Sequence, residues 1–393
     1  MSRDLRDDRD SAVILPPATI GILGGGQLGR MMALDGRKLG YRFSVLDPTP
    51  DCPTSHVADE QVVADFSDVE AARRLAELSD VVTYEFENVD AEVAKALETF
   101  SRVPQGSSLL ATTQHRVREK STLKEAGIPV TPFVPITSLA DIDLAIEKLG
   151  PKLVVKTSRG GYDGKGQWMV RSAADVEAYR GTFEDILATR REDEAAVLIA
   201  EQFVPFQGEI SVVVARNARG DIKAFPPAEN VHVNHILHLS IVPARYPAAV
   251  LDKAVNLAHQ IASSMEIVGL IAVEMFVTEA GELFVNELAP RPHNSGHYTM
   301  DACVTSQFEQ HIRAICNLPL GDVQLLTPVV MVNVLGQHVD AVLARLSTLP
   351  GNVKVHFYGK ASSRVDRKMG HLNILCDDVA EALAWIDEQG IWS

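Results

Sequence analysis

Short apolar runs alternate with helical periods in the first third of the chain. The predicted strands are Thr19–Leu23, Arg42–Leu46 and Val81–Thr83, with helices from Gln27 and near Val69–Leu78 between them. Strands that alternate with helices are typical of a parallel sheet covered by helices. We therefore predict a parallel α/β domain at residues 18–115, after a loose extension at residues 1–17.

The pattern changes after a predicted helix at Arg116–Ala126. Gly127 ends this helix, and the proline-rich stretch Ile128–Pro135 that follows indicates a boundary. Further on, the predicted strands are Leu153–Val155, Trp168–Val170, Val197–Ala200, Ile210–Ala215, Ile222–Phe225 and Val329–Leu335, with helices at Ala248–Met265, Ala341–Leu346 and Val379–Glu388. This order predicts α+β sheets with antiparallel strands.

Two flanking apolar runs, Leu270–Val277 and Glu282–Leu288, predict a β-hairpin that carries two glutamates. If Ala280 and Gly281 form the turn, Glu279 faces Glu282, and counting back places Glu274 opposite Glu287. Opposed like charges destabilise a sheet unless a cation lies between them. Oxygen ligands of this kind favour Mg²⁺ that carries a nucleotide phosphate.

The alternative is a register shifted by one residue, which would turn one of these glutamates to solvent. It would leave an ordinary surface pair instead of a metal site. The spacing alone supports both readings equally.

Composition excludes several classes of function. The chain has 393 residues and a net charge of −15, which disfavours nucleic acid and anionic membrane as partners. No apolar run reaches the length of about 18 residues that a membrane helix needs. Four widely spaced cysteines without a Cys-x-x-Cys motif fit free thiols in the cytoplasm.

A glycine-rich turn, Gly24–Gly29, follows the first predicted strand and opens a helix, with Asp47 at the end of the second strand. This pattern meets the Rossmann dinucleotide fingerprint and by itself suggests NAD. Glycines before a helix N-terminus also bind other phosphates, or simply pack a strand against a helix.

A second glycine-rich segment, Ser158–Gly166, comes just after a strand that ends at Lys156. Its four glycines suit a mobile lid over phosphates, and Lys156 can neutralise a phosphoryl group in the same cleft. Without the lysine, an ordinary hairpin connection would be the better interpretation.

Three weaker signals complete the candidate chemistry. Glu201–Val204 and Glu209 could offer groups to adenine and ribose. The segment Arg291–His297 has a His-x-x-x-His spacing, but Pro292 and Gly296 oppose the helix that a zinc site needs. A basic cluster near the end, Lys360, Arg364, Arg367 and Lys368, suggests a phosphate anchor, although charge runs are usually solvated.

Taken in order, Lys156, the lid Gly161–Gln167, Glu201–Val204 and the Glu274/Glu287 pair resemble the ATP-grasp superfamily. Longer segments are similar to the N5-carboxyaminoimidazole ribonucleotide synthase family, from about Thr19 to the C-terminus. These segments are Gly24–Met31, Thr83–Asn88, Asn286–His297 and Arg367–Asn373.

The resemblance implies a three-part fold and a reaction. It implies a Rossmann-like pre-ATP-grasp domain, ATP-grasp lobes at residues 116–200 (small, with the lid) and 201–318 (large), and a small C-terminal α/β domain at residues 319–393. The family's ligases use ATP, Mg²⁺ and bicarbonate to carboxylate 5-aminoimidazole ribonucleotide in purine biosynthesis, and a homodimer is expected.

By matching position, the resemblance assigns residues to four groups. Catalytic roles fall to Tyr162, Asp163, Lys165 and Lys360, and metal binding to Glu274 and Glu287. ATP contacts fall to Arg116, Lys156, Gly161, Gly164, Gly166, Gln167, Glu201, Gln202, Phe203, Val204, Glu209, His232, Asn286 and Glu287. Substrate contacts fall to Gly26, Gln27, Leu28, Glu85, Arg291, His293, Asn294, Ser295, Lys360, Arg364, Arg367 and Lys368.

One position departs from the family pattern, since many relatives carry arginine where Lys165 stands. Lysine keeps the charge but loses the bidentate fork. Asn286 lies one pleat step from Glu287, so it should point away from the cleft unless the strand is distorted. The rival functions are a related ATP-grasp carboxylase or ligase, a non-catalytic nucleotide sensor and an NAD-dependent dehydrogenase.

Overall fold

The computed structural model describes residues 12–161, 165–190 and 196–392. Its first part is a parallel sheet in the order β3-β2-β1-β4. The strands are β1 (Thr19–Leu23), β2 (Arg42–Leu46), β3 (Glu60–Val62) and β4 (Val81–Tyr84), and the helices are α2 (Gln27–Lys38), α3 (Val69–Glu77), α4 (Ala91–Phe100) and α5 (Ser107–Thr113). The predicted parallel α/β domain is confirmed.

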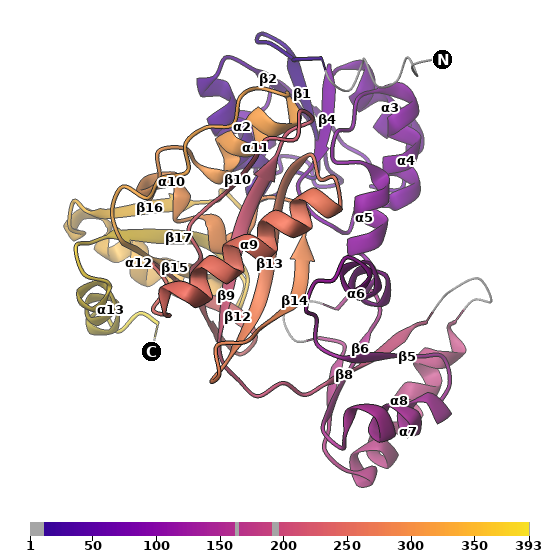
Figure 1. Ribbon diagram of the computed structural model, residues 1–393. Coiled ribbons are helices and arrows are strands. Elements are labelled where there is room, and N and C mark those ends of the chain that lie inside the picture. The colour runs from indigo at the N-terminus through magenta and orange to yellow at the C-terminus, as the bar shows by residue number, and fades with distance from the viewer. Residues whose placement is uncertain (1–11, 162–164, 191–195, 393) are drawn as a thin grey trace.

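A small antiparallel sheet, β5-β8-β6-β7, projects from the rest of the molecule (Figure 1). Its elements are β5 (Phe133–Ile136), β6 (Leu153–Thr157), β7 (Gln167–Val170), β8 (Leu198–Gln202), α7 (Ala140–Leu149) and α8 (Ala173–Ala188), preceded by α6 (Arg116–Glu125). The proline-rich stretch predicted as a boundary enters β5. Because β5 is an edge strand, Pro135 costs the sheet no inner hydrogen bond.

The largest sheet runs in the order β14-β13-β9-β11-β12-β15-β17-β16, with β10 beside β9. Its central elements are β9 (Phe206–Arg216), β10 (Ile222–Ala224), β11 (Ala228–Val233), β12 (Ile236–Val242), α9 (Ala248–Ser264), β13 (Gly269–Thr278) and β14 (Leu283–Ala289). The later ones are α10 (Thr299–Ala302), α11 (Gln307–Ile315), β15 (Val329–Leu335), α12 (Val339–Arg345), β16 (Val353–Phe357), β17 (Lys368–Leu375) and α13 (Val379–Glu388). The C-terminal strands thus continue the central sheet.

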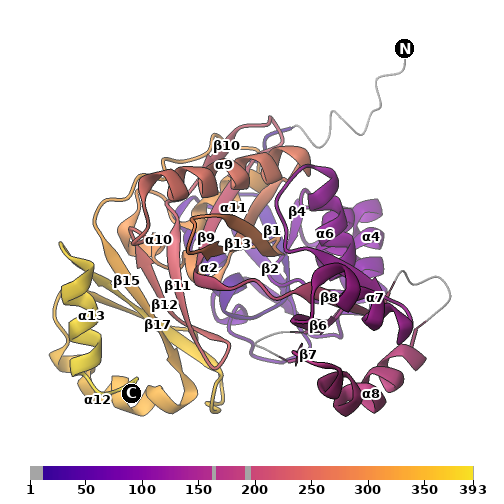
Figure 2. The ribbon, with the colours of Figure 1, turned by 60° about the horizontal axis from the view of Figure 1, so that its bottom comes forward.

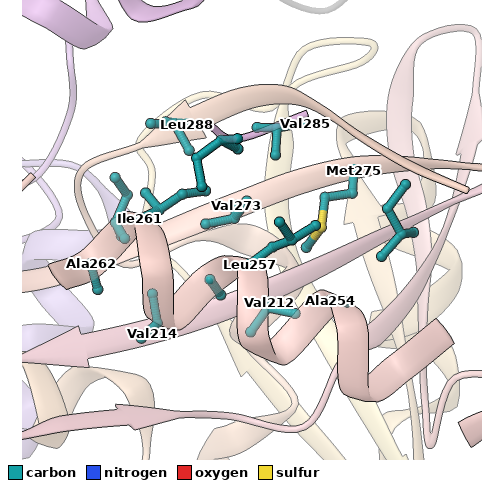
Figure 3. Close-up of a cluster of buried hydrophobic side chains, with 14 of the residues drawn as sticks. Val212, Val214, Ala254, Leu257, Ile261, Ala262, Val273, Met275, Val285 and Leu288 are labelled. Carbon is teal, nitrogen blue, oxygen red and sulfur yellow. The ribbon is translucent and has the colours of Figure 1, made fainter. Parts of the chain in front are cut away.

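Helix α9 covers one face of β9, β13 and β14 (Figure 3). Its residues Ala254, Leu257 and Ile261 recur at helical spacing and are buried against Val212 and Val273 of the sheet. Alternate residues of β13 enter this core, so Glu274 and Phe276 point to the opposite face. Helix α9 therefore supports the hairpin on the face opposite Glu274 and Phe276. None of the described helices is long and apolar enough to span a membrane.

Candidate functional site

A cleft of about 660 Å³ is lined by residues of the small sheet and of the large one. Figure 2 shows how the ribbons of the two sheets are arranged. The walls of the cleft come from β6, β7 and β8 on one side and from β11, β12, β13 and β14 on the other. The lining residues that the sequence predicted are Arg116, Lys156, Gly161, Lys165, Gly166, Gln167, Glu201, Gln202, Phe203, Val204, Glu209, His232, Glu274, Asn286, Glu287, Arg291, His293, Asn294 and Lys368. Tyr162, Asp163 and Gly164 lie outside the described residues.

The hairpin places Glu274 directly opposite Glu287, as predicted, but the pairing of the residues between this pair and the turn differs from the predicted register. The turn is one residue longer than expected, since Thr278 N–H donates to Glu282 O at 3.0 Å and Val277 pairs with Leu283. The expected Glu279–Glu282 pairing is therefore wrong. A β-bulge next to Glu274 shifts the register back by one residue.

The bulge also changes where Asn286 points. Buried and partly exposed residues alternate from Leu283 to Asn286, but Glu287 is partly exposed as well, and both Asn286 and Glu287 line the cleft. The undistorted strand would have turned Asn286 away. Two carboxylates and an amide thus face one opening.

The two carboxylates have different surroundings. Burial, reinforced by the neighbouring charge of Glu287, raises the pKa of Glu274 to about 7. Glu274 Oε1 contacts His293 Nε2 at 3.0 Å, whereas Glu287 Oε2 accepts from Arg116 Nη1 at 3.2 Å. A divalent cation bound by oxygen would relieve the repulsion between the two glutamates, so this donor set fits Mg²⁺.

A chain of hydrogen bonds orients His293. Asn230 Nδ2 donates to Ser211 Oγ at 2.9 Å, Ser211 Oγ donates to Ser295 Oγ at 2.7 Å, and His293 Nδ1 accepts from the Ser295 N–H at 3.3 Å. Because Nδ1 is an acceptor, Nε2 carries the proton that faces Glu274. Burial holds the pKa of His293 well below its usual value, so the ring is neutral.

The His-x-x-x-His spacing does not make a zinc site. His297 contacts Gln307 Nε2 through its Nδ1 at 3.0 Å and packs at a tilt against His371, with ring centroids 4.7 Å apart, whereas His293 contacts Glu274. Among the described residues, no cluster of three histidine, cysteine or acidic side chains could hold a metal ion.

Glu201 is a buried carboxylate between two lysines. Its Oε2 accepts from Lys156 Nζ at 2.9 Å, and its Oε1 lies 3.6 Å from Lys120 Nζ. Burial alone would raise the pKa of Glu201, but the two lysines outweigh it and lower the pKa. The Glu201 carboxylate is therefore held by the two lysines, and the segment Glu201–Val204 lines the cleft.

Sequence reasoning missed the aromatic wall beside this segment. Phe206 stacks on Phe276, with centroids 4.4 Å and planes 11° apart, and both line the cleft. Phe276 lies two residues from Glu274, so strand alternation could have placed it on the same face. Met169 and Leu237 add further apolar surface.

The first glycine turn is filled by the protein's own carboxylates. Glu85 accepts from the N–H groups of Gly26 (2.5 Å) and Gly29 (2.8 Å), and Asp47 accepts from Gly25 N–H at 2.8 Å. A Cβ on Gly26 would lie 2.4 Å from Glu85 Oε1, which explains the glycine. A dinucleotide pyrophosphate would need these same donors, so the NAD interpretation is not supported.

The basic cluster lies beside this turn. Lys360 Nζ donates to Lys368 O at 2.7 Å, and Arg367 Nη1 donates to Ser362 O at 2.9 Å. Burial, with the Arg367 charge adding to it, lowers the pKa of Lys360 to about 8. Arg364 is exposed, and no described contact brings its side chain to the cleft.

Arg291 links this region to the β13–β14 hairpin. It forms a partly buried ion pair with Glu87, a residue that was not predicted to belong to the site, and its charge also acts on Glu85 and Glu287. Gln27 and Leu28 begin helix α2 at the turn, and Leu28 is buried in the core of the parallel domain.

Comparisons with known proteins agree with this geometry. Residues 17–114 match the ribonucleotide synthetase preATP-grasp domain, residues 121–308 the ATP-grasp domain, and residues 329–384 the phosphoribosylaminoimidazole carboxylase C-terminal domain. The N5-carboxyaminoimidazole ribonucleotide synthase of Bacillus subtilis is 46% identical over 96% of this chain and 95% of its own length.

Solved structures of two related enzymes also match nearly the whole chain. An ADP complex of an N5-carboxyaminoimidazole ribonucleotide synthetase superposes with a TM-score of 0.91 at 51% identity, covering 97% of this chain and 98% of that one. The Aspergillus clavatus enzyme, in complex with ADP and 5-aminoimidazole ribonucleotide, gives a TM-score of 0.86 at 29% identity. It covers 95% of this chain and 98% of that one.

Proposed function

The chain belongs to the N5-carboxyaminoimidazole ribonucleotide synthase family of ATP-grasp enzymes, and we propose that its cleft performs that family's reaction with the residues described above. It is an ATP-dependent ligase that carboxylates 5-aminoimidazole ribonucleotide in purine biosynthesis. The observation that carries the assignment of the cleft is the bulged hairpin, which faces two carboxylates and an amide toward Lys156 and Arg116.

ATP would lie along the small sheet. We assign the adenine edge to the backbone of Glu201–Val204 and its face to the apolar wall near Phe206. Glu209, which lies 3.4 Å from His232, is placed to accept ribose hydroxyls. Lys156 would leave Glu201 for a phosphate oxygen, and Lys120 would remain as the counter-charge.

Glu274 and Glu287 would hold Mg²⁺, which supplies a positive charge that offsets the charge developing on the transferred phosphoryl group. Arg116 fixes Glu287 and also donates to Gly161 O at 2.9 Å, so it links the hairpin to the start of the lid. His293 holds Glu274 in one orientation. These contacts would preorganise the ligands before ATP binds.

Bicarbonate would attack the γ-phosphorus of ATP, and the bond to the bridging oxygen would break to release ADP. The exocyclic amine of the ribonucleotide would then attack the carboxyphosphate carbon, phosphate would leave, and the amine would lose a proton. Water must be excluded during this sequence, which is the role proposed for the lid. We assign the proton transfer to Asp163, with Tyr162 and Lys165 beside bicarbonate.

The ribonucleotide would lie between the glycine turn and the basic cluster. Lys360, Arg367 and Lys368 would bind its phosphate, while Glu85 and Arg291 would meet its ribose and imidazole. Arg364 is the weakest member of the predicted set because it is exposed on the turn before β17. With this division, Arg291, whose charge acts on both Glu85 and Glu287, would connect the ribonucleotide site to the hairpin glutamates.

The decisive assay measures phosphate release from ATP with and without bicarbonate and 5-aminoimidazole ribonucleotide. We expect release to depend on the ribonucleotide and to match the formation of the carboxylated product. Release that ignores the ribonucleotide would favour a related ATP-grasp ligase. Nucleotide binding without any release would favour a sensor.

A pH profile tests the role of Lys360. Its amine is charged below a pKa of about 8 and neutral above it, so attraction for the substrate phosphate is lost as the pH rises. We expect the KM for the ribonucleotide to rise above pH 8, by up to about tenfold per pH unit. In Lys360→Arg, which stays charged, this rise should disappear. A wild-type KM that is constant from pH 7 to 9.5 would contradict the role.

We also propose that the enzyme is a cytoplasmic homodimer. Its cysteines are free thiols, three of them buried, which suits a reducing compartment. The dimer rests on the family alone, and light scattering would test it.

A further inference from the structure

Helix α6 presents three charged residues to the edge of the metal hairpin. Arg116, Glu119 and Lys120 are spaced i, i+3 and i+4, so they share one face of the helix. Arg116 holds the Glu287 carboxylate, as described above. Glu119 and Lys120 are 2% and 1% exposed, and the mechanism has not used either as a ligand.

Lys120 contacts the backbone of the bulge. Its Nζ donates to Asn286 O at 3.1 Å and lies 3.6 Å from Glu201 Oε1. The buried Lys120 ammonium thus connects α6 to Glu201 near the end of β8 and to Asn286 at the bulge of β14. A buried ammonium needs such partners because its desolvation is otherwise costly.

Glu119 contacts the same strand two residues further on. The Leu288 N–H donates to Glu119 Oε2 at 3.4 Å. Asn286 and Leu288 flank Glu287, so two consecutive helix residues offer one donor and one acceptor to the backbone on either side of the proposed metal ligand.

These backbone groups belong to an edge strand. β14 is the last strand of the large sheet, and its other edge is covered at Val285, whose N–H donates to Pro129 O at 2.8 Å. Beyond Val285, no further strand pairs with this edge in the described part of the chain, and the side chains of Lys120 and Glu119 hydrogen-bond to its backbone. A bulge interrupts the ladder, and buried backbone groups left unpaired are costly, so these contacts favour the bulged over the regular register.

We propose that Glu119 and Lys120 are positioning residues that clamp the β14 bulge and thereby fix Asn286 and Glu287 toward the cleft. The proposal deepens the proposed function and rests on it for the identity of the ligands. The clamp itself is a property of the protein without nucleotide or metal.

Lys120→Met tests the donor, because methionine keeps an apolar stem of similar length. In the protein without nucleotide or metal, we expect faster amide hydrogen exchange across residues 283–289. With saturating ADP, we expect Mn²⁺ to bind about 10- to 100-fold more weakly. The KM for the ribonucleotide should stay within about twofold of wild type. Lys124→Met, an exposed lysine on the same helix, is the matched control and should change none of these values.

Two further variants separate positioning from stability. Lys120→Met leaves Glu201 with one lysine, so Lys120→Met/Glu201→Gln should recover melting temperature without recovering Mn²⁺ affinity. Glu119→Gln keeps an acceptor oxygen and should exchange like wild type, whereas Glu119→Leu should accelerate exchange at Leu288. The comparison of Glu119→Gln with Glu119→Leu tests the proposed clamp even if Lys120→Met fails to fold.

Unchanged exchange and Mn²⁺ affinity in Lys120→Met would overturn the clamp, as would identical behaviour of Glu119→Leu and Glu119→Gln. A Mn²⁺ affinity restored in the double variant would show that only stability was at stake. The exchange measurements need no substrate. They would therefore stand even if the protein failed to carboxylate the ribonucleotide, and the two proposals can fail separately.

Discussion

Glu287→Gln will lower ribonucleotide-dependent phosphate release from ATP by about 10²- to 10³-fold while the protein stays folded. The carboxylate lies on the bulge of β14 directly opposite Glu274, in the position where a cation would bridge the two. Glutamine keeps the shape but halves the negative charge of the pair. The remaining amide oxygen is a poorer ligand for a hard cation.

Stability should change little because the Glu287 side chain is 46% exposed and its ion pair with Arg116 is partly solvated. Arg116 also retains its bond to Gly161 O. The measurements are phosphate release, Mn²⁺ binding with ADP and the melting temperature. Glu282→Gln, an exposed glutamate on the same hairpin, serves as control. Phosphate release at the wild-type rate from Glu287→Gln would refute the metal site.

Arg367→Ala will raise the KM for 5-aminoimidazole ribonucleotide by about 10- to 100-fold, the size expected for a charge-assisted hydrogen bond to phosphate. The KM for ATP should stay within about twofold, because Arg367 lies with the C-terminal cluster and does not line the cleft between the sheets. The Arg367 charge helps to lower the pKa of Lys360, so in Arg367→Ala the Lys360 amine stays charged and the raised KM reports the loss of Arg367 itself.

Steady-state kinetics with each substrate varied in turn will measure this split. Arg367→Lys keeps the positive charge but loses the bidentate fork, so its KM for the ribonucleotide should lie between those of the wild type and of Arg367→Ala. Lys354→Ala removes an exposed charge from neighbouring β16 and controls for net charge. A defect confined to ATP would reassign Arg367 to the nucleotide.

Elements with strong local patterns were predictable from the sequence. β1, β2, β15 and α13 occur at the predicted bounds, because uninterrupted apolar runs and a clear helical period leave little choice of structure. The strand at Phe133–Ile136 was hidden by Pro135, which is acceptable only because the rest of the fold places β5 at an edge.

The site was predictable in its parts but not in its register. The opposition of Glu274 and Glu287 is correct, yet it arises from a longer turn and a compensating bulge, and neither has a local sequence signal. The backbone beside the bulge is contacted by α6, which lies about 170 residues earlier in the chain. Similarly, only the fold shows that Glu85 fills the glycine turn.

The continuity of the large sheet separates what is fixed in this molecule from what is free to shift. The hairpin glutamates on β13 and β14 and Lys368 on β17 belong to one hydrogen-bonded sheet, whereas Lys156 belongs to β6 of a second, smaller sheet. A movement of the small sheet relative to the large one would therefore change the proposed contacts of Lys156 with ATP without altering the spacing between Glu274, Glu287 and Lys368. An inhibitor that reaches from Glu274 and Glu287 to Lys368 would therefore contact only the large sheet, and its binding should not depend on the position of the small one.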